Sequence, residues 1–279
     1  LLGGADIRAL ADFLGVVPTK KLGQNFVTDP NTIRKIVASA KLQANETVVE
    51  IGPGLGAMTK PLLAHLNKMA VVELDRDLVK RWNAENISKL TVFEADALKF
   101  DFAEWVRAAK EEAKKSSVGG RILIVGNLPY NISSPLLFHL MDAASDVDEQ
   151  VFMLQAEVIE RMVATHGSSE YSRLSVMLQS RYILENVLDV PPEAFDPPPK
   201  VDSAIVRMTP RTDLILSDKE YQALEALVSM AFAQRRKVLR NNLASVKDKL
   251  NLSDEILSQR AQDISVADYI SWACKLAHQ

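Results

Sequence analysis

The residues Gly126–Asn131 combine an amide, a proline and an aromatic ring directly after the apolar run Arg121–Val125, which we predict to be a strand. The Asn127 amide offers one acceptor oxygen and two donor hydrogens. Pro129 fixes the backbone, and the Tyr130 ring offers a flat face on which a base can stack. These groups could hold a planar amine by its N–H groups and present its nitrogen to an electrophile. The alternative is a strand-end turn with a buried tyrosine.

A glycine loop, Gly52–Gly56, follows the short β-branched run Thr47–Ile51 and precedes a helix that we expect to begin at about Met58. A strand, a glycine loop and a helix together let a ligand approach the backbone closely. The Gly-x-Gly-x-Gly spacing differs from the Gly-x-Gly-x-x-Gly pattern of dinucleotide sites. The loop therefore favours S-adenosylmethionine, which has no pyrophosphate, over NAD.

Two acidic residues end the next predicted strands, Glu73 in Ala70–Leu74 and Asp96 in Leu90–Asp96. Glu73 is placed to accept hydrogen bonds from ribose hydroxyls, and Asp96 could accept the amine of an adenine. Alternatively, Asp96 only caps the following turn. Ligands of doubly wound sheets bind outside the carboxyl ends of the strands. Polar signals at four successive strand ends therefore predict one nucleoside site.

Further along the chain, the prolines Pro197–Pro199 pre-order a loop that leads into a last strand, Ala204–Met208. We expect this loop to present Phe195 as a fixed stacking partner, although an aromatic ring packed beneath the loop is the alternative. Near the N-terminus, the loop 18–26 could be a linker or a lid over a pocket. A helix that starts at Pro30, with Asp29 as its N-cap, should follow it.

The pattern becomes helical after Pro210, and we predict a catalytic domain at 1–211 and a small helical domain at 212–279. Between Gln234 and Lys249 the second domain concentrates basic residues against the single acid Asp248, in a chain of formal net charge −3. This segment is a candidate surface for RNA phosphates, or else a solvated helix face. Its basic residues are Arg235, Arg236, Lys237, Arg240, Lys247 and Lys249.

The composition, 47% hydrophobic and 25% charged, is ordinary for a globular protein. No apolar run is long enough for a transmembrane helix, and the charges of the first residues do not resemble a signal peptide. The lone Cys274 excludes an intrachain disulfide and a cysteine-cluster metal site. We expect a cytoplasmic protein without a metal.

Six motifs, which span nearly the whole chain, together resemble the KsgA/Erm family of rRNA adenine methyltransferases, and most closely its small-subunit adenine dimethyltransferase branch. They are Lys21–Phe26, Glu50–Gly56, Glu73–Asp75, Gly126–Asn131, Pro197–Ala204 and Gln234–Lys237.

The resemblance implies a Rossmann-like class I methyltransferase fold with a mostly parallel seven-stranded sheet and a helical C-terminal domain. It also implies that S-adenosylmethionine is used to dimethylate N6 of two adjacent adenines in 16S rRNA late in small-subunit biogenesis. Val27, often Leu in the family, and Leu22, often Phe, are apolar exchanges with little consequence. The implied cofactor contacts are Asn25, Val27, Gly52, Gly54, Glu73, Asp96 and Asn127.

For catalysis, we expect the Asn127 oxygen and the Leu128 carbonyl to accept the two N–H groups of the adenine amine. Pro129 would keep this segment in position. Tyr130 and Phe195 would stack on the two faces of the base. Arg235, Arg236, Lys237 and Arg240 would contact rRNA phosphates.

Three rival functions share parts of this pattern. An Erm-type 23S rRNA methyltransferase shares the core motif, but the segment Pro197–Ser203 and the length of the helical tail favour the small-subunit enzyme. A ribosome-assembly or transcription factor with lost catalysis is disfavoured by the intact Glu73, Asp96 and Asn127. A NAD oxidoreductase has no hydride-transfer site here. The expected partner is 16S rRNA within the small subunit or its precursor, and the chain should act as a monomer without an obligate protein partner.

Overall fold

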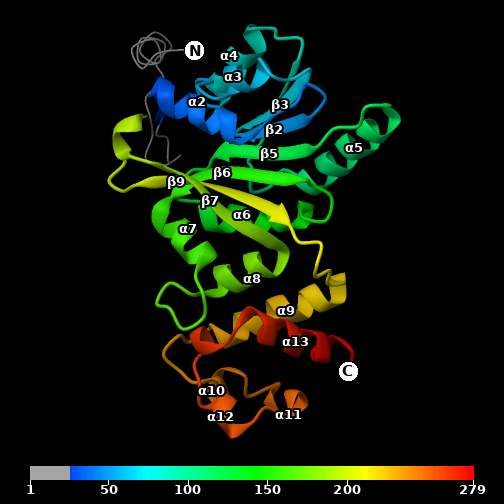
Figure 1. The fold of residues 1–279 in the computed structure, drawn as a ribbon, viewed down its shortest axis with the longest axis vertical. Coiled ribbons are helices and arrows are strands. Elements are labelled where there is room, and N and C mark those ends of the chain that lie inside the picture. Colours follow the sequence, from blue (N-terminus) through cyan, green and yellow to red (C-terminus); the bar gives the residue numbers. More distant parts are fainter. Residues whose placement is uncertain (1–25) are drawn as a thin grey trace. The chain divides into compact units, whose positions relative to one another are not determined.

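A seven-stranded sheet organises the first part of the computed structural model, which describes residues 26–279 (Figure 1). The strand order is β4-β3-β2-β5-β6-β9-β7. The pairs β2–β3, β2–β5, β3–β4 and β5–β6 are parallel, and β6–β9 is antiparallel. The predicted mostly parallel sheet is therefore confirmed. Its strands are β2 (Thr47–Ile51), β3 (Lys68–Glu73), β4 (Leu90–Glu94), β5 (Ile122–Asn127), β6 (Glu149–Gln155), β7 (Tyr182–Val190) and β9 (Ser203–Pro210).

Helices alternate with these strands, as the sequence pattern predicts. The first described helix begins at Pro30, where the Asp29 carboxylate accepts a 2.7 Å hydrogen bond from the Thr32 backbone. This N-cap satisfies one of the backbone donors that a helix start leaves unpaired. The α-helices between β1 (Phe26–Val27) and α8 (Arg173–Arg181) are α2 (Pro30–Ser39), α3 (Thr59–Leu63), α4 (Arg76–Ala84), α5 (Phe102–Lys115), α6 (Ser133–Leu140) and α7 (Ala156–Val163).

Both faces of the central strands of the sheet are buried. Alternate side chains of β2 and β5, such as Val48 and Val125, belong to one apolar cluster with Ile33 of α2 and Leu62 of α3. The intervening side chains, such as Ile124, are equally inaccessible to solvent. Near-continuous apolar strands are typical of a parallel sheet that is covered on both sides. Polar side chains on such strands are therefore confined to the strand ends and to special positions.

A separate two-stranded sheet pairs β1 (Phe26–Val27) antiparallel with β8 (Phe195–Asp196). Val27 lies opposite Phe195, and the Thr28 backbone N–H donates to the Ala194 carbonyl at 2.8 Å. Residues 18–25 of the predicted N-terminal loop lie outside the described residues.

The structure divides into two compact units. One comprises the chain up to Ile159 together with Glu185–Pro210, and the other comprises Glu160–Leu184 and Arg211–Gln279. The longer part of the second unit begins at Arg211, next to the boundary predicted between residues 211 and 212. It also includes Glu160–Leu184, which the sequence analysis placed in the catalytic domain.

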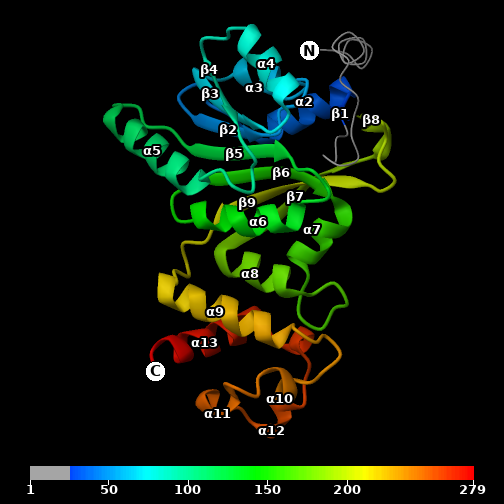
Figure 2. The same cartoon turned by 180° about the vertical axis from the view of Figure 1, so that it is seen from behind.

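The second unit is helical (Figure 2). Its segment Glu160–Leu184 joins the C-terminal helices through side-chain contacts that sequence spacing does not reveal. The Ser180 hydroxyl hydrogen-bonds with the Tyr221 hydroxyl at 3.0 Å, and the Arg181 guanidinium lies 3.4 Å from the centre of the Tyr221 ring. The helices of this unit are α8 (Arg173–Arg181), α9 (Asp218–Ala231), α10 (Leu239–Asn242), α11 (Lys247–Leu250), α12 (Asp254–Leu257) and α13 (Val266–Ala277). No helix among residues 26–279 has both the length and the apolar composition needed to cross a membrane.

Candidate active site

The carboxyl ends of four parallel strands surround one cavity of about 240 Å³. Gly52 after β2, Glu73 of β3, Asp96 after β4 and Asn127 of β5 all line it. The topology therefore brings together the four polar signals that were predicted from consecutive strand ends. Of the other residues singled out in the sequence, Val27, Gly54 and Pro129 also line this cavity.

The glycine loop adopts a backbone that favours glycine. Gly52, Gly54 and Gly56 have φ values of 65°, 54° and 91°, in the region that L-residues with side chains rarely occupy. A Cβ atom at Gly56 would also lie 2.5 Å from the Trp82 ring. The spacing of these glycines therefore has a conformational cause in addition to any ligand.

Helix α4 holds the glycine loop from outside the cavity. The Trp82 indole N–H donates to the Gly54 carbonyl at 3.0 Å, and an Arg81 Nη1 donates to the Leu55 carbonyl at 3.0 Å. Neither residue was predicted from the sequence, because nothing in their local pattern distinguishes this segment from an ordinary amphipathic helix. They fix the loop carbonyls and so shape the wall that a ligand would meet.

The Glu73 carboxylate is held in a defined position at the end of β3. Its two oxygens accept backbone N–H groups from Gly54 at 3.2 Å and from Asp75 at 2.9 Å. Burial raises the pKa of the carboxyl, and the backbone donors oppose that shift. A buried carboxylate beside the glycine loop suits the recognition of neighbouring hydroxyl donors.

Asp96 combines the two interpretations that its sequence context allowed. One of its carboxylate oxygens accepts the Leu98 backbone N–H at 2.9 Å, so Asp96 does cap the following turn. It also lines the cavity, as do Ala97 and Leu98 of that turn.

Asn127 is the last residue of β5, and a close approach of two strands precedes it. A Cβ atom at Gly126 would lie 2.7 Å from the Ile51 carbonyl of β2, so only glycine fits there without a shift. The next backbone N–H, that of Leu128, donates to the Met153 carbonyl of β6 at 3.1 Å. The Asn127–Leu128 segment is thus fixed between β2 and β6, with the Leu128 side chain buried.

Tyr130 is half-buried, and its hydroxyl hydrogen-bonds with the Ser203 hydroxyl of β9 at 3.0 Å. Burial raises the pKa of this phenol. Among the described residues that line the cavity are Asn127, Pro129 and Asn131, but Tyr130 is not one of them. The expectation that Asn127 shares a cavity with Gly52 and Glu73 is met, whereas Tyr130 lies beside that cavity.

Phe195 does not occupy the exposed position that the sequence predicted. Its side chain is only 3% exposed and belongs to the main apolar cluster. The cause is the pairing of β8 with β1, which places Phe195 opposite the buried Val27. The alternative interpretation, an aromatic ring packed beneath a proline-rich loop, describes this residue, and a stacking role for it is not supported. Asn25, the remaining predicted cofactor contact, lies outside the described residues.

Glu50 is a cavity residue to which the sequence analysis assigned no role. It is 1% exposed, lines the cavity and accepts a 2.6 Å hydrogen bond from the Thr59 hydroxyl. Desolvation raises the pKa of its carboxyl to about 8. An acid in the middle of the apolar run Thr47–Ile51 was the signal that could have identified it.

The four basic residues predicted to contact RNA are all exposed. Arg235, Arg236 and Lys237 lie in the segment between α9 and α10, so the alternative of a solvated helix face does not describe them. An Arg235 guanidinium nitrogen donates to the Ser169 carbonyl, and Arg240 forms a 2.9 Å ion pair with Asp254. This surface belongs to the helical unit.

Comparison with known proteins finds relatives that match nearly the whole chain. The ribosomal RNA adenine dimethylase family matches residues 18–277. Ribosomal RNA small subunit methyltransferase A of Cupriavidus metallidurans is 51% identical over 269 residues, which cover 93% of each protein. The protein of the same name from Bordetella petrii is 51% identical over 257 residues, covering 90% of this chain and 92% of that one.

Solved structures show the same fold. A dimethyladenosine transferase from Plasmodium falciparum aligns with a TM-score of 0.70 at 26% identity, covering 88% of this chain and 95% of that one. The 23S rRNA methyltransferase ErmE aligns with a TM-score of 0.61 at 23% identity, covering 90% of this chain and all of that one, which is a likeness of fold alone. These likenesses confirm the predicted class I methyltransferase fold with a helical C-terminal region.

Proposed function

Because the chain belongs to the ribosomal RNA adenine dimethylase family, we propose that it dimethylates N6 of two adjacent adenines in the 3′-terminal hairpin loop of 16S rRNA. The methyl donor is S-adenosylmethionine, and the reaction takes place in the cytoplasm late in small-subunit biogenesis. The single observation that supports this assignment most directly is the meeting of Gly52, Glu73, Asp96 and Asn127 at one cavity.

The residues present suit S-adenosylmethionine. Gly52 leaves room on the cavity wall where a side chain would stand, and the Glu73 and Asp96 carboxylates can accept hydrogen bonds from hydroxyl or amine donors. When bound, this cofactor supplies an electrophilic methyl group on its sulfonium. We assign its binding to Val27, Gly52, Gly54, Glu73, Asp96 and Asn127, and by resemblance to Asn25.

Asn127 and Leu128 would orient the adenine amine. The N6 lone pair of adenine is delocalised into the ring, so this nitrogen is a poor nucleophile. If the Asn127 side-chain oxygen and the Leu128 carbonyl accept its two N–H groups, the nitrogen is drawn toward a tetrahedral geometry and is aligned for attack. Positioning of this kind can contribute several kcal/mol, up to roughly 7–11 in the most favourable cases. Pro129 and the fixed strand ends keep both acceptors in place.

Tyr130 would stack on the target base after the adenine has left its loop stack. Its bond with Ser203 limits the rotation of the ring. A stacked base of this kind is worth about 1–3 kcal/mol. In the helical unit, Arg235, Arg236, Lys237 and Arg240 would contact rRNA phosphates.

The assignment is tested by incubating the protein with labelled S-adenosylmethionine and small ribosomal subunits that lack these methyl groups. Label should appear on adenine N6 of 16S rRNA, with up to two methyl groups on each adenine. Large subunits provide the second arm of the experiment. Label in 23S rRNA alone would indicate the Erm-type activity instead, and cofactor binding without any transfer would indicate an assembly factor.

A further inference from the structure

A second groove lies behind the glycine loop, on the side of α2 and α3. Its volume is about 870 Å³. One wall comes from α2 and the turn after it and the other from α3. Gly56 of the glycine loop and the following Ala57 also line the groove. The groove is also lined by apolar residues, among them Val37, Leu42, Pro61 and Ala64.

The polar residues around this groove are mostly basic. Arg34, Lys41 and Lys60 line it together with His65 and Gln43, and no carboxylate is among the described lining residues. The bias is a property of the whole segment. From Pro30 to Val72 the only acidic residues are Glu46 and Glu50, although the chain contains 36 acids. Both of these carboxylates are buried.

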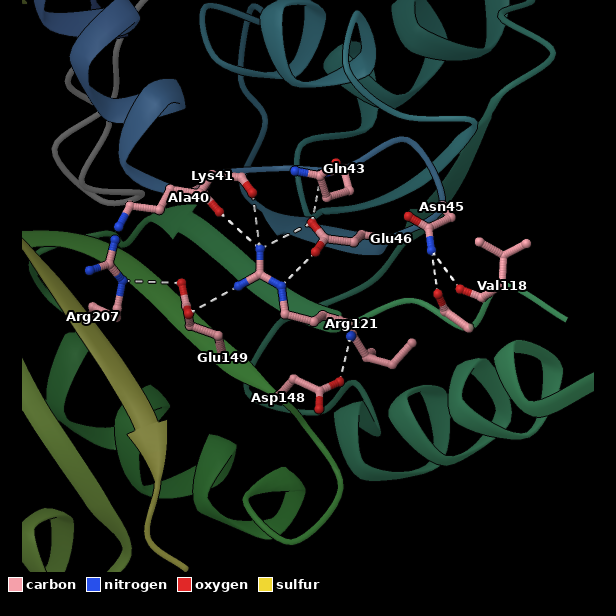
Figure 3. Close-up of polar contacts among 12 residues, drawn as sticks. Ala40, Lys41, Gln43, Asn45, Glu46, Val118, Arg121, Asp148, Glu149 and Arg207 are labelled. Atoms are coloured by element: carbon pink, nitrogen blue, oxygen red, sulfur yellow. Dashed lines mark hydrogen bonds and ion pairs between the residues drawn. The ribbon is translucent and has the colours of Figure 1, made fainter. Parts of the chain in front are cut away.

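A partly buried ion network pairs Glu46, one of these acids, with Arg121 and fixes a wall of the groove (Figure 3). Arg121 binds both carboxylate oxygens of Glu46, at 2.5 and 3.1 Å, and donates to Glu149 at 3.2 Å. The same guanidinium donates to the Ala40 and Lys41 carbonyls, both at 3.2 Å. The turn that carries Lys41 is therefore held in place by its backbone, while the Lys41 side chain is exposed.

The basic residues of the groove are arranged for a polyanion. Arg34, Lys41 and Lys60 are all exposed and come from both walls, whereas a pocket for one small anion would bury its donors. Lys60 forms a 3.1 Å ion pair with Glu85, and Arg34 donates to Asn31. Such exposed pairs are weak and are readily exchanged for a phosphate. The apolar lining residues suit the sugar or base faces of a nucleic-acid strand.

We propose that the α2–α3 groove is a second rRNA-binding surface, which takes a segment of the small-subunit RNA outside the methylated loop. This inference rests on the proposed function, because it assumes that the chain acts on ribosomal RNA. The groove would give the catalytic unit an RNA-binding surface of its own, in addition to the basic segment of the helical unit. Occupation of the groove also places RNA against Gly56 and Ala57, and Ala57 lines the cofactor cavity as well.

The test uses the double variant Arg34→Gln/Lys41→Asn in the full chain. Lys41 has φ 48°, a conformation that asparagine tolerates better than most residues, so the change should not disturb the turn. The matched control is Lys35→Gln/Lys80→Gln, which removes two charges from exposed residues of α2 and α4 outside the groove. Binding to unmethylated small subunits is measured at several salt concentrations.

We expect the groove variant to bind subunits about 10-fold more weakly, with a salt slope reduced by about 0.7–0.9 for each lost phosphate contact. Affinity equal to wild type, or the same loss in the control, would overturn the proposal. So would a parallel loss of S-adenosylmethionine affinity, because the defect would then lie in the cofactor cavity. Methyl transfer by the wild-type protein to the same subunits is measured in parallel and tests the proposed function separately.

A photo-crosslinker at Ala64→Cys, in a Cys274→Ser background, identifies what occupies the groove. Ala64 is an exposed lining residue, and Cys274 is the only native cysteine. The expected product is a crosslink to 16S rRNA at a position outside the methylated loop. A crosslink to a ribosomal protein, or no crosslink in the bound complex, would contradict an RNA-binding groove.

Discussion

At the scale of single residues, the site depends on how tightly the end of β5 is held. Gly126 allows β5 to approach β2, and the bond from the Leu128 N–H to Met153 ties the next residue to β6. Asn127 is fixed between these two constraints and lines the cavity. A preorganised acceptor of this kind costs little reorganisation when the substrate binds.

Asn127→Ala should therefore keep the fold and lose methyl transfer. We expect kcat to fall by about 100- to 1000-fold, which is the usual effect of removing one preorganised polar group. Turnover on small subunits is measured together with thermal unfolding. The matched control is Asn131→Ala, which truncates a second amide of the same cavity. Near-normal turnover by the Asn127 variant would exclude the proposed role.

The raised pKa of Glu50 predicts that the free energy of unfolding depends on pH. Its carboxyl has a pKa near 4.5 in the unfolded chain and about 8 in the folded protein, so folding takes up a proton between these values. The folded state then binds more protons than the unfolded state. The free energy of unfolding should therefore fall as pH rises through this window, by at most about 1.4 kcal/mol per pH unit.

Glu50→Gln removes this titration and keeps an acceptor for the Thr59 hydroxyl. The variant should unfold at a higher temperature than wild type near pH 8 and lose that advantage near pH 5. Thermal unfolding of both proteins without cofactor measures the difference. Parallel pH profiles for the two proteins would mean that Glu50 titrates close to its ordinary value.

At the scale of elements, short segments distant in sequence build the walls of the site. Helix α4 holds the glycine loop through Trp82 and Arg81. The two-residue strand β1 brings Val27 to the cavity only because it pairs with β8. The proline-rich loop 197–202 then connects β8 to Ser203, which anchors Tyr130. Phe195 therefore supports the site by packing.

Phe195→Ala should consequently behave as a core mutation. We expect a loss of about 3–5 kcal/mol in the free energy of unfolding, as for other buried phenylalanines, while Phe195→Leu should retain most of the stability. Denaturant unfolding of the two variants provides the measurement. An alanine variant as stable as wild type but with a raised KM for the subunit would restore the stacking hypothesis.

At the scale of the whole molecule, charge is segregated along an acidic chain. The formal net charge is −3, yet the segment Gln234–Lys249 and the α2–α3 region are both basic. Average charge therefore says little about the partner, because an RNA surface needs only local excess of cations.

Arg236→Gln/Lys237→Gln should weaken subunit binding and reduce its salt slope by about 0.7–0.9 per lost contact. These two are chosen because Arg235 and Arg240 also have intramolecular partners. Binding of S-adenosylmethionine should be unchanged, since neither residue is among the described residues of the cavity. The control Lys114→Gln/Lys115→Gln removes two exposed charges from the end of α5. An equal effect in both variants would show that net charge alone matters.

Much of the fold and of the site follows from local sequence. The run Thr47–Ile51 is β2 as predicted, and the helix predicted to start at Pro30 is α2, with Asp29 as its N-cap. The polar residues of the site stand directly after such runs. Because parallel strands place their carboxyl ends at one edge of the sheet, knowing the strands was enough to predict that Gly52, Glu73, Asp96 and Asn127 meet.

Tertiary structure alone decided the rest, because burial depends on segments that arrive from elsewhere in the chain. The pairing of β1 with β8 buried Phe195, which sequence patterns could as well have exposed. Packing against Tyr221 joined Glu160–Leu184 to the helical unit. The fold also brings the Trp82 indole to the Gly54 carbonyl of the glycine loop, and it places α2 beside α3 so that they line the second groove. Local spacing reports where a strand or helix ends, but only the folded chain determines which side chains remain accessible to a ligand.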